Sequence, residues 1–297
     1  MRLRISKPVK IAIEVVVIGL LVLLFFLVVD PARLRVYLAL ITLRSIGGLL
    51  AIQLTLHLVG MVQWLLILRQ AGVTSSAWEV FWTRLSGCAI TSLTPSMYFG
   101  GEPVRASMLK NPTVSYQTLY ATIAVDKYVE LFTKLPAAAI GFAMLIQLAQ
   151  PGPALLILSA AFILVFCAFF LYLMVKLFQG SRFVLRAAKW VLVPMARVRP
   201  RLAVKIQMAL KEFTKDVSRI LKKKLSFALA MFFGLLLSAV EVLQIYYVLA
   251  VLGVYDLRRA FAIFFATVFQ GLLSFIPGNI GTMEGLNLFM FSILKLG

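Results

Sequence analysis

Long apolar runs without charged residues most limit what this chain can fold into. Residues 45–68 and 154–175 form runs of 24 and 22 residues that contain no Asp, Glu, Lys or Arg. A helix of about 20 apolar residues crosses a hydrocarbon layer of ~30 Å. Of the 297 residues 62% are hydrophobic and 14% charged. A soluble protein of this length would need more polar residues to cover its hydrophobic cores. We therefore predict an all-α, polytopic membrane helix bundle made of a single integral membrane domain, residues 1–297.

Three further segments predict membrane crossings. Residues 11–29 are interrupted only by Glu14 and follow a basic N-terminus. This run is long for a signal peptide and ends without a small-residue cleavage pattern, so we predict a retained helix with a cytoplasmic N-terminus. Residues 116–150 and 225–255 are the other two crossings, and the second carries Glu241 near its middle.

The basic residues indicate which side of the membrane faces the cytoplasm. The chain has 30 Lys and Arg against 11 Asp and Glu, and thirteen of the basic residues lie within residues 182–224. Because positive charge accumulates on cytoplasmic segments, we place this region on the cytoplasmic side of a cell membrane. We expect no nucleic acid partner.

Residues 179–224 also contain an amphipathic pattern. Apolar residues recur there every three or four positions, as on one face of a helix: Leu202, Ile206, Ala209, Phe213, Val217 and Ile220. Such a helix either lies along the lipid headgroups or packs on the protein's own loops. Both interpretations keep the segment in the cytoplasm.

Several kinds of chemistry lack the residues they need. His57 is the only histidine, and Cys88 and Cys167 are isolated in apolar stretches. A histidine-based metal centre and a catalytic triad are therefore excluded, and we expect no cofactor. There is no GxxxxGK[ST] pattern, so we do not expect ATP hydrolysis by this chain.

Residues 89–110 interrupt an apolar segment with helix-breaking residues. Thr94 and Pro95 end the apolar approach, Gly100 and Gly101 follow, and the segment leaves through charged residues that include Glu102 and Arg105. A continuous helix is not expected here, because Pro and paired Gly disrupt helical hydrogen bonding.

Residues 272–291 show the same kind of interruption near the other end of the chain. The apolar run stops at Pro277 and Gly278, passes Gly281, and continues from Glu284 into about ten apolar residues.

These two interrupted segments predict two re-entrant broken hairpins that enter from opposite faces, a pattern typical of an inverted repeat. Non-helical backbone at membrane depth persists only where protein or a wet cavity covers it. Such hairpins would line a cavity suited to an anionic headgroup, helped by Arg105. The alternative is that Pro and Gly only kink two packed helices.

A charged stripe lies between these hairpins in the sequence. Asp126, Glu130 and Lys134 are four residues apart and share one helical face, and Lys127 can reach Glu130. Ionisable residues inside a membrane are candidate functional residues, unless this part of the helix protrudes into the cytoplasm. Glu241 also needs a partner, for which Arg84 is one candidate.

Three segments resemble the marker regions of a known family. TPSMYFGGEPVRASML, VDKYVELF and FIPGNIGTMEG are similar to segments of the flippase-like membrane domain of lysylphosphatidylglycerol synthases. In those bifunctional proteins a cytoplasmic domain attaches an amino acid to phosphatidylglycerol, and the membrane domain moves the product outward. Only six residues follow Phe291, so the resemblance implies translocation or lipid binding rather than synthesis.

The resemblance also assigns site residues. The family's positions carry over to Gly100, Gly101, Glu102 and Arg105 in the first hairpin and to Pro277, Gly278, Gly281 and Glu284 in the second. Lys127 departs from the arginine expected after the acidic residue of the middle marker, which weakens bidentate phosphate recognition there.

From these observations we expect a lipid flippase-like transporter or binding protein for an anionic phospholipid or lipid-linked headgroup. Its substrate-binding residues would be Thr94, Pro95, Gly100, Gly101, Glu102, Arg105, Asp126, Lys127, Glu130, Pro277, Gly278, Gly281 and Glu284. One alternative is a membrane-embedded transferase acting on a polyprenyl-phosphate or phospholipid, with Asp126 or Glu130 as base. Another is a non-transporting partner protein. A homo-oligomer and a separate synthase are the protein partners we consider.

Overall fold

The computed structural model describes residues 39–94, 100–150, 152–178, 199–273 and 282–294, together with Val193 and Met195. Every regular element in these ranges is a helix, as the sequence predicts. The helices are α3 (Leu43–Ala71), α4 (Ala77–Leu93), α5 (Glu102–Met108), α6 (Tyr116–Ala149), α7 (Pro153–Phe178), α9 (Pro200–Lys222), α10 (Lys224–Val251), α11 (Leu257–Leu273) and α12 (Thr282–Ile293).

The predicted crossings coincide with long helices. Helices α3, α6 and α10 are long and apolar enough to cross a membrane. Helix α7 contains the predicted run 154–175. The predicted first crossing, residues 11–29, lies outside the described residues.

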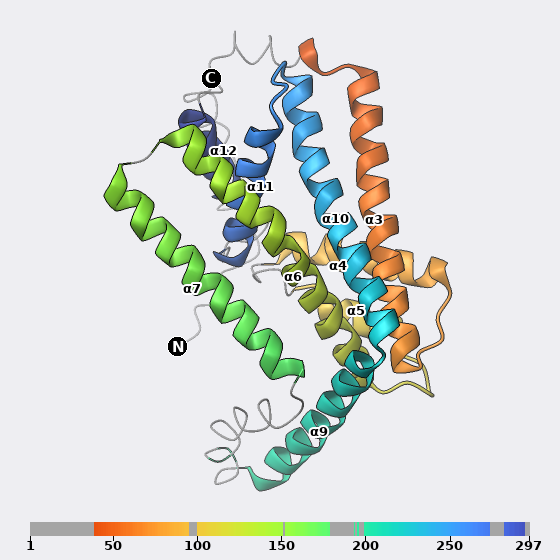
Figure 1. Cartoon of the computed structure of the whole chain (residues 1–297). Coiled ribbons are helices and arrows are strands. Elements are labelled where there is room, and N and C mark those ends of the chain that lie inside the picture. Colours follow the sequence, from red (N-terminus) through yellow and green to blue (C-terminus); the bar gives the residue numbers. More distant parts are fainter. Residues whose placement is uncertain are drawn as a thin grey trace, which may run out of the picture.

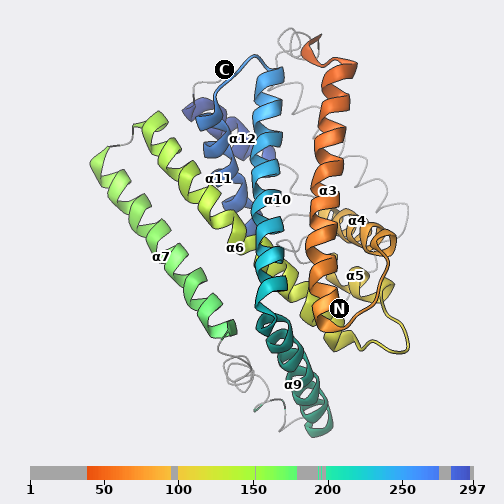
Figure 2. The same cartoon turned by 45° about the vertical axis from the view of Figure 1, so that its right-hand side comes forward.

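Antiparallel pairs of helices make up the bundle. Helix α10 packs along α3 in the opposite direction, and α11 packs along α6 (Figure 1). Helix α7 runs at the edge of the bundle and contacts α6 and α9. Helix α9 extends from one end of the bundle, as two views show (Figure 2).

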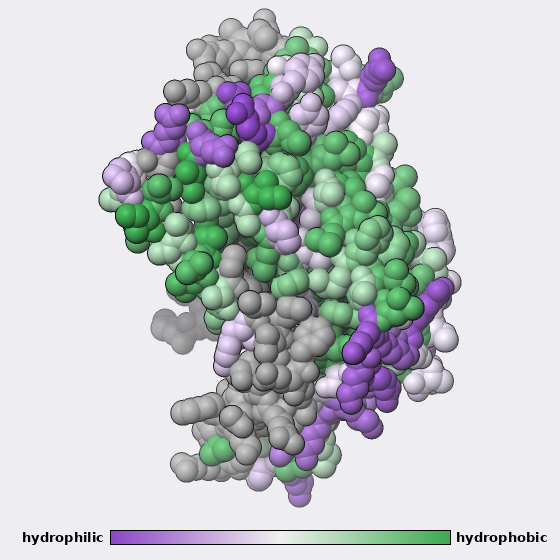
Figure 3. Space-filling model, viewed as in Figure 1, coloured by the Kyte–Doolittle hydropathy of each residue, from purple (hydrophilic) through white to green (hydrophobic). Residues whose placement is uncertain are grey.

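Apolar side chains fill the interior and also cover the outside. One core cluster includes Trp64, Leu119 and Ile220, and a second includes Val242 and Phe264. The face seen in Figure 3 carries a broad hydrophobic band, with hydrophilic residues gathered toward its two ends. A band of this kind is stable only in contact with lipid acyl chains, so the fold is that of a membrane helix bundle.

Helix α9 is amphipathic, and its two halves lie in different surroundings. Val217 and Ile220 in the C-terminal half are buried, whereas Leu202 and Met208 in the N-terminal half are 40% and 65% exposed. The C-terminal half therefore packs on the protein itself, mainly on α6. For the exposed N-terminal half, contact with lipid headgroups stays a prediction.

Two acidic residues of α9 fasten it to the beginning of α6. Ser115, the N-cap residue of α6, donates from Oγ to Glu212 Oε1 at 2.8 Å. Thr118 Oγ1 donates to Asp216 Oδ2 at 2.6 Å. Carboxylates are stabilised near a helix N-terminus by the helix dipole, so these contacts set the angle at which α9 leaves the bundle.

The same local arrangement occurs twice, in opposite directions. Helices α3 and α10 have 29 and 28 residues, and each is followed by a glycine in the left-handed region, Gly72 at φ 81° and Gly253 at φ 82°. The next residue closes the turn in both copies: Val73 N donates to Leu68 O at 2.9 Å, and Val254 N donates to Leu249 O at 2.8 Å.

A helix of 17 residues follows each turn, α4 in the first copy and α11 in the second, and a short helix comes after each. Helix α3 and helix α10 run in opposite directions along the bundle (Figures 1 and 2). The inverted repeat of two broken hairpins expected from the sequence stays a prediction, because the tips of both hairpins lie outside the described residues.

The first predicted interruption separates two helices. Helix α4 ends at Leu93 and α5 begins at Glu102, and Gly101 N donates back to Thr91 Oγ1 at 2.9 Å. A Cβ atom on Gly101 would overlap the backbone of Gly87, so only glycine allows α5 to lie so close to α4. Residues 95–99 and 274–281 lie outside the described residues, and a re-entrant position in the bilayer stays a prediction.

A charged turn joins α10 to α11. Asp256 accepts hydrogen bonds from the backbone N and the side-chain Nε of Arg258, at 3.0 Å and 3.2 Å. The side-chain hydrogen bond from Arg258 lowers the pKa of Asp256, so this carboxylate stays ionised at mildly acidic pH.

We expect Gly141→Ala to destabilise the bundle. A Cβ atom at Gly141 would overlap the backbone oxygen of Phe261 and come within 2.9 Å of Phe265 Cβ, so α6 and α11 would have to separate. Overpacking of this kind costs about 1–3 kcal/mol. Thermal unfolding in detergent measures it. The control is Gly47→Ala, a helical glycine with open space around it, where alanine should be neutral or stabilising. Equal melting temperatures for the two variants would contradict the described packing.

Candidate functional site

A carboxylate deep in the bundle holds two arginines. The Asp126 side chain is 0% exposed. Its Oδ2 atom accepts hydrogen bonds from Arg105 Nη2 at 2.6 Å and from Arg84 Nη1 at 3.1 Å. Its Oδ1 atom accepts a hydrogen bond from Gln63 Nε2 at 2.9 Å. We call Gln63, Arg84, Arg105 and Asp126 the arginine cluster.

Four helices contribute one residue each to the arginine cluster: α3 contributes Gln63, α4 Arg84, α5 Arg105 and α6 Asp126. Arg84 and Arg105 therefore tie the α4–α5 hairpin to one long helix, while Gln63 joins the second long helix to the same carboxylate. Displacing this carboxylate would remove the ionic link between the hairpin and α6.

Glycines give both guanidinium-bearing side chains their space. A Cβ atom at Gly60 would lie 2.5 Å from Arg84 Nε, and one at Gly87 would lie 2.6 Å from Arg105 Cγ. The arginines therefore cross the neighbouring helices at positions where a larger residue would exclude them.

An aromatic ring covers the second arginine. The Arg105 Cζ atom lies 3.8 Å from the ring centroid of Trp64, which is fully buried. A guanidinium over an indole face is stabilised electrostatically, and more so when it is desolvated. The Trp64 Nε1 atom donates to Thr122 Oγ1 at 3.4 Å, which holds the ring in place.

A second ionic network continues along α6. Lys127 and Lys134 lie 3.3 Å and 3.5 Å from the carboxylate of Glu130, and Lys134 Nζ donates to Glu241 Oε1 at 2.9 Å. The predicted contact between Lys127 and Glu130 is confirmed. The suggestion that Arg84 pairs with Glu241 was wrong, because Arg84 pairs with Asp126 and the partner of Glu241 is Lys134.

The two networks differ in charge balance. Glu130 and Glu241 match Lys127 and Lys134, whereas Asp126 pairs with both guanidinium groups of the arginine cluster and Glu130 acts on one of them, Arg84, from further away. The arginine cluster therefore has an excess of positive charge. Two buried polar atoms of the cluster, Arg105 Nε and Gln63 Oε1, have no hydrogen-bond partner among the described residues. The same holds for Oε2 of Glu102, which lies one helical turn before Arg105 on α5. Arg105 Nε is the one donor among these three atoms, and an unpaired guanidinium N–H can bind an anionic ligand, whereas the two oxygens are acceptors.

The structure brings only some of the predicted site residues together. Arg105 and Asp126 are in contact, as are Lys127 and Glu130. Glu102 is buried at the start of α5, after Gly100 and Gly101, and Thr94 ends α4.

The other predicted residues are not placed by the structure. Pro95, Pro277, Gly278 and Gly281 lie outside the described residues. Glu284 belongs to α12, but its side chain is also outside them.

Sequence reasoning missed half of the arginine cluster. Gln63 and Trp64 stand in a charge-free apolar run, where a single polar amide gives no signal of its partner. Arg84 could have been assigned to the site from the sequence, because an arginine within an apolar segment needs a buried counter-ion.

Comparisons with known proteins agree with this architecture. Residues 11–297 match the family model described as the lysylphosphatidylglycerol synthase TM region. The chain belongs to this family. A UPF0104 membrane protein of Methanothermobacter thermautotrophicus is 28% identical over 240 residues, which cover 78% of this chain and 70% of that protein.

A UPF0104 membrane protein of Pyrococcus horikoshii is 22% identical over 239 residues, covering 76% of this chain and 70% of that protein. No solved structure matches the chain significantly. This member of the lysylphosphatidylglycerol synthase TM family therefore has relatives in two archaea that are themselves described only as membrane proteins.

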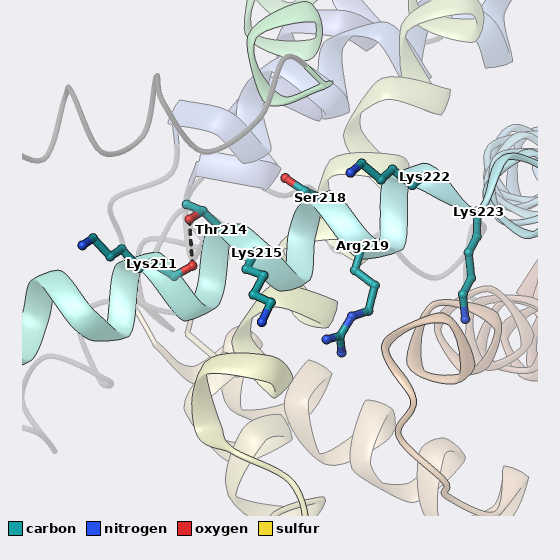
Figure 4. A pocket seen from close by; sticks show the side chains of 7 residues that line it. All are labelled: Lys211, Thr214, Lys215, Ser218, Arg219, Lys222 and Lys223. Atoms are coloured by element: carbon teal, nitrogen blue, oxygen red, sulfur yellow. Dashed lines mark hydrogen bonds between the residues drawn. The ribbon is translucent and has the colours of Figure 1, made fainter.

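A separate basic surface lies on α9 of this family member. Lys211, Lys215, Arg219, Lys222 and Lys223 line an open pocket together with Thr214 and Ser218. The basic side chains are spread along the helix and do not converge on one point (Figure 4). This geometry suits many weak contacts with an anionic surface better than a single small ligand.

We expect Asp126→Asn to destabilise the protein strongly. The substitution keeps the side-chain volume but leaves two buried guanidinium groups without their counter-ion, a change that typically costs about 3–5 kcal/mol. Thermal or denaturant unfolding in detergent measures the loss. Asp256→Asn, in the exposed turn before α11, is the matched control and should change the melting temperature little. A melting temperature for Asp126→Asn as high as that of the control would show that the arginine cluster does not hold the helices together.

Proposed function

We propose that this protein is a lipid flippase-like transporter or binding protein for an anionic phospholipid or a lipid-linked anionic headgroup. The observation that carries the proposal is the arginine cluster, two guanidinium groups around one carboxylate inside a lipid-facing bundle. Charged groups are costly in an apolar environment, and those retained there typically mark a substrate pathway. Family membership supports a lipid-related function.

An anionic headgroup would compete with Asp126 for the two arginines. Phosphate oxygens accept the same hydrogen bonds as the carboxylate, and a guanidinium can bind two of them at once. The unpartnered Arg105 Nε atom provides a further donor. Because Arg84 and Arg105 belong to the α4–α5 hairpin and Asp126 to α6, binding would loosen the hairpin from the long helix.

The two broken hairpins would provide access to the cluster. We propose that α4–α5 and α11–α12 are re-entrant, entering the bilayer from opposite faces. Glu102 and Glu284 would hold the hairpins or contact an amine-bearing headgroup. Helices α4 and α5 lie from the middle of the bundle downward and α11 and α12 lie in its upper half (Figures 1 and 2), which supports this arrangement.

The location follows from the charges. We propose a cell membrane location with the N-terminus and α9 in the cytoplasm, because thirteen basic residues fall within 182–224 of the sequence and α9, within that region, extends from one end of the bundle (Figures 1 and 2). The basic face of α9 would contact anionic headgroups or a separate synthase. A homo-oligomer is the other assembly that we consider.

The transferase alternative has less support from the geometry. A general base needs a lone pair directed at its substrate. Both oxygens of Asp126 already accept hydrogen bonds from Gln63, Arg84 and Arg105. Glu130 lies between two lysines.

Transfer of fluorescent phosphatidylglycerol in proteoliposomes tests the proposal. We expect Arg105→Ala and Glu284→Ala each to slow transfer about tenfold or more, because a lost charge-assisted hydrogen bond costs about 1.5–3 kcal/mol. Arg105→Lys should be intermediate, since it keeps the charge but loses bidentate contact. The control is Arg258→Ala in the exposed turn before α11, which should transfer lipid at the wild-type rate. Wild-type transfer by both Arg105→Ala and Glu284→Ala would refute the site assignment.

A further inference from the structure

A stripe of special residues runs along one side of α3. Gln53, His57, Gly60 and Trp64 are separated by four, three and four positions, so they follow one another on a single helical face. At 1.5 Å per residue, the stripe extends about 16 Å along the helix. We call these four residues the α3 stripe. It contains the only histidine of the chain.

One end of the α3 stripe lies at the arginine cluster. Trp64 packs under the Arg105 guanidinium, and the absence of a side chain at Gly60 makes room for Arg84. The next residue outward, His57, is within electrostatic reach of Arg84. The stripe is therefore continuous with the cluster at its inner end.

The other end of the α3 stripe is polar and faces outward. Gln53 Oε1 accepts a hydrogen bond from Gln244 Nε2 of α10 at 2.9 Å, and Gln53 Nε2 lies 3.3 Å from His57 Nε2. The adjacent Leu50 and Leu54 are 65% and 52% exposed, as expected of a surface in contact with acyl chains. Polar side chains at such a surface are costly, so an amide pair and an imidazole there are candidate functional residues.

Burial rises steadily from one end of the stripe to the other. Gln53 is exposed, His57 is half-buried, and Gly60 and Trp64 are buried. The stripe therefore connects the buried cluster to the lipid-facing surface between α3 and α10.

We propose that the α3 stripe is the path along which an anionic phospholipid headgroup moves between the arginine cluster and the lipid-facing surface beside Gln53 and Gln244, between α3 and α10. The proposal rests on the proposed function and adds the route. The headgroup would pass over Gln53 and His57 while its acyl chains stay among the leucines outside.

The chemistry of the stripe suits movement rather than retention. Transport requires sites that bind well enough to be entered and weakly enough to be left. The charged cluster is the strong site. Amide and imidazole N–H groups donate to phosphate oxygens without a formal opposite charge, so they bind the same ligand less tightly.

A purely structural role makes a different prediction. The Gln53–Gln244 hydrogen bond would then serve only to join α3 to α10, as polar side chains often do between membrane helices. Gln53→Glu separates the two roles. A carboxylate still accepts the hydrogen bond from Gln244 Nε2, but it repels an anionic headgroup.

The experiment compares Gln53→Glu and Gln53→Leu with matched controls at Thr55. Thr55 is exposed on the opposite face of α3, and its hydroxyl donates to Ala51 O of its own helix at 2.8 Å. Thr55→Glu places the same charge on the same helix away from the stripe, and Thr55→Val removes a polar group there. The probe is acyl-labelled phosphatidylglycerol in proteoliposomes, and the melting temperature and co-purifying phosphatidylglycerol are measured for every variant.

We expect both Gln53 variants to slow transfer about tenfold relative to their Thr55 controls, with co-purifying phosphatidylglycerol unchanged because the arginine cluster is intact. Transfer by Gln53→Glu at the rate of Thr55→Glu would overturn the path. So would a loss of transfer only in Gln53→Leu together with a lower melting temperature, which would show a joining role.

The outcomes also separate the path from the function on which it rests. If Arg105→Ala slows transfer and the Gln53 variants do not, the path is wrong and the proposed function stands. If wild-type protein moves no phosphatidylglycerol, the proposed function fails and the path fails with it.

Discussion

The structure depends on one buried carboxylate that must neutralise two guanidinium groups away from water. Asp126 holds Arg84 and Arg105 at once, and these three side chains come from three different helices. In an apolar bundle, removal of any partner leaves a charge with no solvent to compensate it. This requirement places α4, α5 and α6 relative to one another more strictly than apolar contacts could, because apolar packing is not directional.

The surrounding fold explains how such a cluster can exist. Gly60, Gly87 and Gly101 let helices and arginine side chains approach closely, and Trp64 covers one guanidinium. Arg84 lies inside α4, in the first of two similar helix–turn–helix units. The corresponding helix of the second unit, α11 (Leu257–Leu273), has no arginine beyond its first turn. The arginine cluster therefore belongs to the first of the two helix–turn–helix units, and the charges of the two units differ.

Much of this architecture could be predicted from the sequence, for reasons that particular segments show. The charge-free residues 45–68 form a helix because lipid leaves no other way to satisfy backbone hydrogen bonds. Pro and Gly ended α4 where expected, and the contact of Lys127 with Glu130 followed from helical spacing. The pairing of Glu241 was not predictable, since Lys134 is 107 residues away and Arg84 was an equally suitable cation.

The sequence by itself determined the class of the protein, an all-helical membrane bundle with two interrupted segments, because apolar length and helix-breaking residues act locally along the chain. Only the tertiary structure decided which charges meet. Gln63, Arg84, Arg105 and Asp126 are far apart in sequence, and their contact depends on how four helices cross. Electrostatic partners are chosen by distance in space, which helical periodicity does not encode across separate helices.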